Sequence, residues 1–139
     1  MSVRRKSIFV SIASLSAGGL SYIMFRKSTY IAVFFSHIEF ISVLQDSCSA
    51  IPCDFLRYYF PDFAWCLALC CSLQILLYPK KHWAILSAVT ALLCGVTWEL
   101  FQYLNAVSGT ADFADVCMYL LAGVAGIIIH MEEKENEKT

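Results

Sequence analysis

The stretch of sequence that decides the fold runs from residue 60 to residue 104 and reads FPDFAWCLALCCSLQILLYPKKHWAILSAVTALLCGVTWELFQYL. It holds two apolar segments, Phe60–Tyr78 and Trp83–Leu104, with Pro79-Lys80-Lys81-His82 between them. Each segment is close to the ~20 residues that an α-helix needs to cross the hydrocarbon core of a bilayer. The alternation of apolar and polar residues that is typical of barrel strands is absent. These residues therefore predict two membrane-spanning helices joined by a short basic turn.

Two further apolar segments flank this pair, Ser7–Phe25 before it and Phe113–Ile129 after it. Of the 139 residues, 59% are hydrophobic and 15% are charged, whereas roughly 25% are charged in soluble domains. This composition argues against a soluble enzyme, a disordered chain and a nucleic-acid-binding domain. We predict an all-α protein, a four-helix bundle forming a single membrane domain over residues 1–139. As an alternative, Ser7–Phe25 has the basic start and apolar run of a signal peptide.

The distribution of Lys and Arg predicts the orientation of the bundle. With the N-terminus inside, seven of these residues lie on the inner side and three on the outer side. We therefore expect both termini, including the polar tail 131–139, in the cytoplasm. The inner residues are Arg4, Arg5, Lys6, Lys80, Lys81, Lys134 and Lys138, and the outer ones are Arg26, Lys27 and Arg57.

The segment 28–59 between the first two spans is predicted to lie on the outer side. Within it, Tyr30–Leu44 has apolar residues at helical spacing but also contains His37 and Glu39. We expect an amphipathic helix at the membrane interface or packed on the bundle, and the alternative is a lid over an outer site. A loop over Ser47–Asp54, with a helix-breaking proline at position 52, should follow.

The seven cysteines show no zinc-binding spacing. Five fall within the predicted spans, where cysteine packs as a small apolar residue. Cys48 and Cys53 lie in the outer segment, where they could pair as a disulfide or remain free thiols. We expect no cofactor and assign no metal site.

Polar residues at the outer ends of the spans are the candidate site. Glu99 and Gln102 share one helix face, and a carboxylate at that depth in lipid is costly unless its face turns into the bundle. Asp112 and Asp115 again lie three residues apart, just across the short loop Asn105–Ala111. Helix capping explains one of these two acids well and the second only partly.

Asp62 begins the second span at the same interface, behind Pro61, and a place in the first turn of a helix also explains it. Arg57 lies about one turn earlier and is the nearest counter-charge. We expect the carboxylates of Asp62, Glu99, Asp112 and Asp115 to meet together with Gln102 near the outer ends of the helices. Arg57, a cation, or a proton on one of the acids should then offset the clustered charge.

Three motifs, taken in order, carry a resemblance to a known family. Pro61–Trp65 (PDFAW) opens one span, Glu99–Gln102 (ELFQ) closes the next, and Gly109–Asp115 (GTADFAD) opens the last. Together they cover about half of the chain, Phe60–Ile129, which resembles the VanZ-like membrane proteins. The fragment Gly18–Arg26 (GGLSYIMFR) is similar to short VanZ-like proteins of Gram-negative bacteria.

The resemblance implies a small four-span protein of the bacterial inner (cytoplasmic) membrane. The name-giving member of the family is associated with low-level resistance to the glycopeptide teicoplanin, by a mechanism that the resemblance does not supply. Family members commonly carry an asparagine in the last helix. Here that stretch is Tyr119–Gly123 (YLLAG), so any role of that asparagine is not carried over.

Three functions remain open from the sequence. The first is an envelope-associated binding protein, whose outward-facing polar cluster holds a membrane lipid head group, an envelope glycolipid, a cell-wall precursor or an ion. The second is an intramembrane enzyme, in which the carboxylates hold a divalent metal and act on a lipid-linked phosphate. No nucleophile-and-base pair lies near the acids, which argues against the enzyme. The third is a purely structural bundle, and the oligomeric state is open in all three.

Overall fold

The computed structural model describes residues 3–26, 30–51 and 53–136. All regular structure in these residues is helical, which confirms the predicted all-α fold, a helical bundle. The elements are α1 (Val3–Phe25), α2 (Tyr30–Phe35), α3 (Glu39–Ser49), the π-helical turn η1 (Phe55–Tyr59), α4 (Phe60–Leu77), α5 (Trp83–Tyr103) and α6 (Phe113–Asn136).

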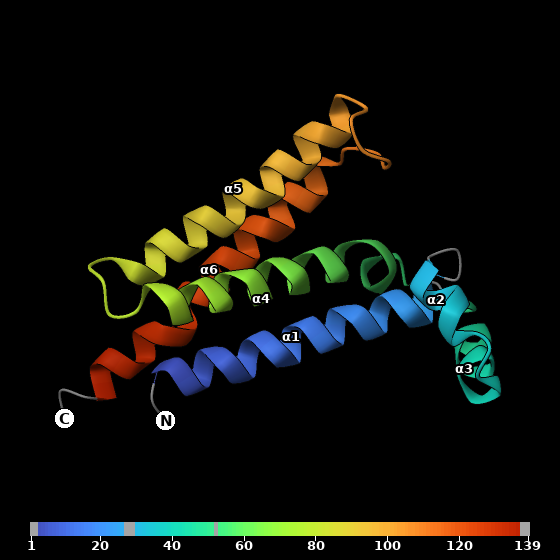
Figure 1. Ribbon diagram of the computed structural model, residues 1–139, viewed down its shortest axis with the longest axis horizontal. Coiled ribbons are helices and arrows are strands. Elements are labelled where there is room, and N and C mark those ends of the chain that lie inside the picture. The colour runs from blue at the N-terminus through green and yellow to red at the C-terminus, as the bar shows by residue number, and fades with distance from the viewer. Residues whose placement is uncertain (1–2, 27–29, 52, 137–139) are drawn as a thin grey trace.

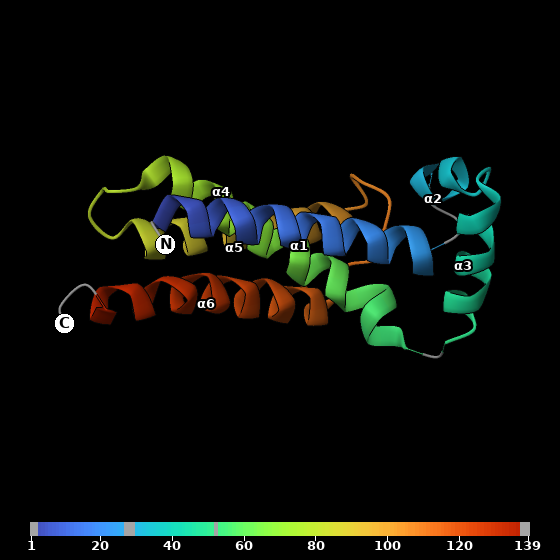
Figure 2. The same cartoon turned by 90° about the horizontal axis from the view of Figure 1, so that it is seen from below.

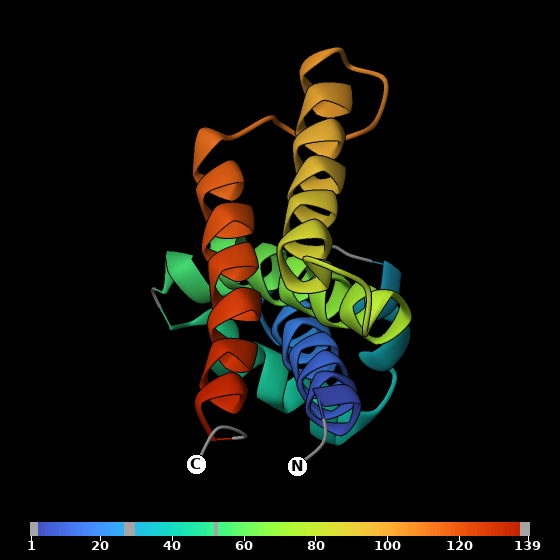
Figure 3. The same ribbon diagram turned by 90° about the vertical axis from the view of Figure 1, so that its left-hand side faces the viewer.

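The four long helices form two antiparallel pairs, which cross at α4 (Figure 1). Helix α1 runs along α4, α5 runs along α6, and α4 also packs on both α5 and α6. The start of α1 and the end of α6 lie at one end of the molecule, whereas α2 and α3 project from the other end (Figure 2). Seen along the bundle, α5 lies on one side of α4 and α1 on the other, while α6 runs past α4 and ends beside the start of α1 (Figure 3). Helix α4 is therefore the common packing partner of the other three long helices.

Within the described residues, three helices are long and apolar enough to cross a membrane, namely Val3–Phe25, Phe55–Leu77 and Trp83–Tyr103. The predicted fourth span, Phe113–Ile129, is a shorter apolar stretch of the longer helix α6. The outward faces of the bundle also carry exposed apolar side chains, including Phe9, Leu76 and Leu93. Such surfaces are typical of contact with lipid or with another protein.

Helix α6 continues beyond the predicted span into the polar tail and ends at Asn136, where Glu- and Lys-rich residues favour a helix. One sequence-based expectation needs correction. The expected single helix over Tyr30–Leu44 is instead two short helices, α2 and α3. Between them the Ser36 hydroxyl donates to the carbonyl oxygen of Val33 at 2.7 Å, and Ile38 is extended. Such side-chain bonding competes with the helical ladder.

The loop after α3 is also shorter than expected, since α3 continues to Ser49. Pro52, the predicted helix breaker, lies outside the described residues, as do Lys27 and Lys138 of the charge count. All seven cysteines are free thiols in this structure. A disulfide between Cys48 and Cys53 stays a prediction.

Small and polar residues join the helices at the end of the bundle that carries the start of α1. The side chain of Gln74 is fully buried, and its Nε2 donates to the carbonyl oxygen of Gly126 at 2.9 Å. The Ser7 hydroxyl, at 3.5 Å, approaches Oε1 of the same amide. One side chain on α4 thus bonds to both α1 and α6, and this fixes the three helices at that end.

Candidate functional site

A cavity of about 880 Å³ opens at the other end of the bundle. It lies among the end of α1, the turn η1, the start of α4, the end of α5 and the start of α6. All six residues of the candidate site line it, namely Arg57, Asp62, Glu99, Gln102, Asp112 and Asp115. The structure therefore brings the sequence-predicted cluster to one place, while its role in binding stays a prediction.

Glu99 lies at the wall of this cavity between α5 and α6, with only 7% of its surface exposed. Its Oε1 accepts a hydrogen bond from the Tyr119 hydroxyl at 3.0 Å. Its Oε2 accepts one from the backbone N–H of Asp112, also at 3.0 Å. Both carboxylate oxygens thus accept hydrogen bonds, one from α6 and one from the loop before it. Glu99 therefore connects α5 to α6 and also forms part of the cavity wall.

A glycine on α5 makes the contact with Tyr119 geometrically feasible. Gly95 lies one turn before Glu99 on the same face, and a Cβ atom there would come within 2.5 Å of Cδ2 in the Tyr119 ring. The ring therefore lies directly against the α5 backbone, with its hydroxyl at the carboxylate. This role of Tyr119 was missed in the sequence, where the residue stands within an apolar helix without any motif.

The loop between α5 and α6 is fastened by Gln102. In the amide orientation that satisfies both of its ends, Gln102 donates to the carbonyl oxygen of Thr110 at 3.2 Å and accepts from Nε1 of Trp98 at 3.0 Å. Gly109 passes so close that a Cβ atom there would lie 2.5 Å from the terminal amide group of Gln102, and its φ is +140°. A glycine at this position satisfies both constraints.

The two aspartates at the start of α6, Asp112 and Asp115, differ in their hydrogen bonding. Asp112 Oδ1 accepts from the backbone N–H of Ala114 at 2.9 Å, which caps the helix as one of the sequence alternatives proposed. Asp115 lies in the first turn, where the helix dipole favours a negative charge. Its Oδ1 is buried, and no donor within the described residues lies in hydrogen-bond reach. A buried acceptor without a donor is unusual in a folded protein and is suited to receive one from a ligand or water.

The basic side of the cavity is formed mainly by Arg26, at the end of α1. Its Nε donates to the carbonyl oxygen of Arg57 at 2.9 Å, and its Nη1 donates to the Tyr22 hydroxyl at 3.1 Å. The guanidinium also lies over the rings of Tyr22 and Tyr58, at 4.7 and 5.5 Å from their centroids. These contacts position the cation firmly at the wall.

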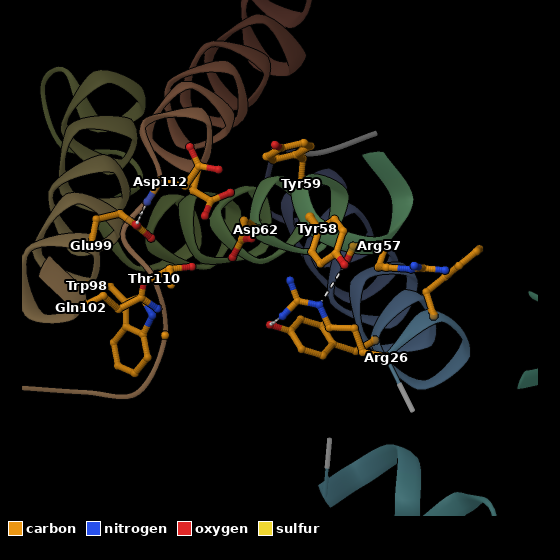
Figure 4. Close-up of a pocket in the computed structure, with 14 residues that line it drawn as sticks. Arg26, Arg57, Tyr58, Tyr59, Asp62, Trp98, Glu99, Gln102, Thr110 and Asp112 are labelled. Carbon is orange, nitrogen blue, oxygen red and sulfur yellow. Dashed lines mark hydrogen bonds between the residues drawn. The ribbon is translucent and has the colours of Figure 1, made fainter. Parts of the chain in front are cut away.

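Figure 4 shows how the two signs of charge are arranged. Glu99 and Asp112 lie on one side, Asp62 lies in the middle, and the Arg26 guanidinium approaches from the other side. The Arg57 side chain points away from Asp62 in this view, although the residue lines the cavity. The cation nearest to the acids in this view is therefore Arg26, whereas the sequence predicted Arg57 as the nearest counter-charge.

The carboxylates do not form a ready metal-binding set. Among the residues that the structure describes, no group of three or more His, Cys, Asp or Glu side chains could hold a metal ion. Two of the four acids already accept hydrogen bonds from protein groups. This geometry offers no support for the metal-dependent enzyme.

Comparison with known proteins gives no further guide to the identity of the chain. No family model matches it, and neither a curated protein nor a solved structure matches it. What is established is its class: the part of the chain that the structure describes is all-helical, with three helices long and apolar enough to span a membrane.

Proposed function

We propose that this chain is a membrane-embedded binding protein that holds the polar head group of a membrane lipid or of a lipid-linked envelope precursor. The observation that supports the proposal is the 880 Å³ cavity. Its lining combines four carboxylates with the guanidinium of Arg26, and it lies next to long apolar helices. A head group attached to an apolar tail fits such a place, since the tail can remain in the bilayer. The predicted orientation puts the cavity at the outer face of the bacterial inner membrane.

The resemblance to the VanZ-like family belongs to the same proposal. Binding of an envelope lipid or cell-wall precursor would link the cavity to glycopeptide sensitivity. Expression of the wild-type chain in a susceptible bacterium should then raise the inhibitory concentration of teicoplanin. The double variant Asp62→Asn/Asp115→Asn, expressed at the same level, should not raise it. Equal teicoplanin sensitivity with and without the wild-type chain would contradict a role in resistance. Lipid binding would then depend on the direct test below.

The direct test uses Asp62 and Asp115 because neither carboxylate bridges α5 and α6, as Glu99 does. Protein purified in mild detergent should retain polar lipid, quantified by mass spectrometry per mole of protein. The double variant should retain about tenfold less, since a hydrogen bond to a charged group contributes about 1.5–3 kcal/mol. Asp54→Asn is the matched control, because Asp54 is exposed and does not line the cavity.

Helix content and elution volume should be unchanged in all three proteins, which separates loss of binding from loss of fold. Equal lipid retention by the wild type, the double variant and the Asp54→Asn control would contradict the proposal. The cavity would then be a feature of a purely structural bundle.

A further inference from the structure

An apolar groove of about 450 Å³ adjoins the polar cavity. The two share Tyr22, Asp62 and Trp98 in their linings, so the polar cavity and the apolar groove lie directly next to each other. The apolar part is lined chiefly by Leu15, Gly19 and Ile23 of α1 and by Trp65 of α4. A polar cavity and an apolar groove are therefore neighbours at this end of the bundle.

The opening of the groove is lined by exposed residues of α1, α4 and α5. Helix α1 packs along α4, and α5 packs on α4 and α6, whereas α1 and α5 are not packed along each other in the described part of the chain. The rim residues Leu15, Trp65 and Trp98 expose 58%, 45% and 49% of their surfaces. In a bilayer, this opening faces the acyl chains, and a lipid can enter through it without crossing the head-group region.

Two adjacent glycines of α1, Gly18 and Gly19, line the groove but have different surroundings. A Cβ atom on Gly18 would lie 3.1 Å from Cβ of Ala64, so Gly18 permits close packing of α1 on α4. A Cβ atom on Gly19 would meet nothing within 4 Å. Packing against the rest of the protein therefore does not require a glycine at position 19, and its lack of a side chain leaves the groove open.

The charges of the polar part indicate the kind of head group. Four carboxylates and two guanidinium groups line it, so its formal charge is negative. The buried Oδ1 of Asp115 also lacks a donor among the described residues. An ammonium group supplies N–H donors and a positive charge to the acidic side, and a phosphate suits the guanidinium of Arg26 on the other side.

From these observations we infer that cavity and groove together form one binding site for an aminophospholipid. Its ammonium group lies among the carboxylates of α4, α5 and α6, its phosphate lies beside Arg26, and one acyl chain occupies the groove between α1 and α5. This inference rests on the proposed function and specifies its ligand and its route of entry. A lipid-linked diphosphate fits the net negative lining less well, because it brings further negative charge.

The groove is tested by filling it. Gly19→Leu places a side chain in open space and should lower the retention of phosphatidylethanolamine about tenfold in protein reconstituted into nanodiscs of mixed lipids. Ser16→Leu is the matched control, because Ser16 is an exposed small residue of α1 that does not line the groove. Both variants should keep the wild-type helix content. Loss of lipid in Gly19→Leu but not in Ser16→Leu supports the inference.

Two outcomes separate this inference from the function on which it rests. If Gly19→Leu retains lipid normally while Asp62→Asn/Asp115→Asn does not, the groove is not the tail site, but head-group binding stands. If neither variant changes lipid retention, both proposals fall.

The head group is tested with nanodiscs of equal chain composition that contain phosphatidylethanolamine, phosphatidylcholine or phosphatidylglycerol. We expect several-fold stronger retention of phosphatidylethanolamine, because a choline lacks N–H donors and a glycerol lacks the positive charge. Equal retention of phosphatidylglycerol would overturn the assignment of an ammonium group.

Discussion

The Tyr119 hydroxyl donates a 3.0 Å hydrogen bond to Oε1 of Glu99 across the interface between α5 and α6. Both side chains are buried, and the same carboxylate accepts from the backbone of Asp112 through its other oxygen. Glu99 thus has a structural role whether or not the cavity binds a ligand. A substitution at Glu99 alone therefore cannot separate a site from a structural bundle, and the following predictions treat the two roles separately.

Tyr119→Phe should lower the free energy of unfolding by about 0.5–1.5 kcal/mol, since it removes one buried interhelical hydrogen bond and keeps the ring. Unfolding by a denaturing detergent, followed by circular dichroism, measures this change. Tyr103→Phe is the control, because Tyr103 is 74% exposed and should give no measurable change. Equal stabilities of the two variants would show that the Tyr119 hydroxyl contributes nothing to the interface.

Gly95→Ala should destabilise the protein by about 1–3 kcal/mol, because the added Cβ atom would lie 2.5 Å from the Tyr119 ring and the helices must move apart. Gly19→Ala should be neutral or stabilising by up to about 1 kcal/mol, since it gains helix propensity without meeting another atom. The same unfolding measurement compares the pair. A wild-type stability for Gly95→Ala would contradict the close approach of ring and backbone.

Gly109→Ala should destabilise the loop between α5 and α6 by about 1–3 kcal/mol, because an alanine is strained at a φ of +140° and would approach the Gln102 amide. Faster proteolysis of the loop should accompany the lower stability. In a Gln102→Ala background the contact is gone and only the backbone strain remains, so the cost of Gly109→Ala should fall. An unchanged cost in that background would show that the amide does not press on position 109.

Thiol labelling tests both burial and orientation. Cys66, Cys70 and Cys71 are fully buried, whereas Cys48 and Cys53 are half-buried outside the long apolar helices. A membrane-impermeant maleimide should label Cys48 and Cys53 in intact cells or in spheroplasts, if these two are reduced and face outward as predicted. The three buried cysteines should react only after unfolding. Labelling of Cys48 and Cys53 only in inverted vesicles would show that the orientation is reversed.

Hydropathy and segment length were sufficient to predict the helical class and the approximate positions of the four long helices. The short connection between the third and fourth helices also placed Glu99 and Asp112 at similar depth, because antiparallel neighbours joined by a short loop must align there. These features depend on local composition and on chain connectivity, and both are present in a single sequence.

Features that depend on three-dimensional packing were not predictable in the same way. Arg26 follows an apolar span and looks like a flanking charge, yet the packing of α1 on α4 brings it to the cavity wall. Tyr119 stands in an apolar run, and only its position opposite Gly95 explains its role. The break between α2 and α3 falls where Ile38 is extended, and the apolar spacing of that segment gave no signal for it.

The serines of α1 have a consequence for the order in which the protein can assemble during synthesis. Ser7 approaches Gln74, Ser11 bonds to the carbonyl oxygen of Ala68 and to Ser72, and Ser21 bonds to the carbonyl oxygen of Leu56. All of these partners lie in η1 or α4, at least 35 residues later in the chain. Helix α1 is therefore synthesised before the native partners of its hydroxyl groups exist, and these contacts form only after α4 has been made.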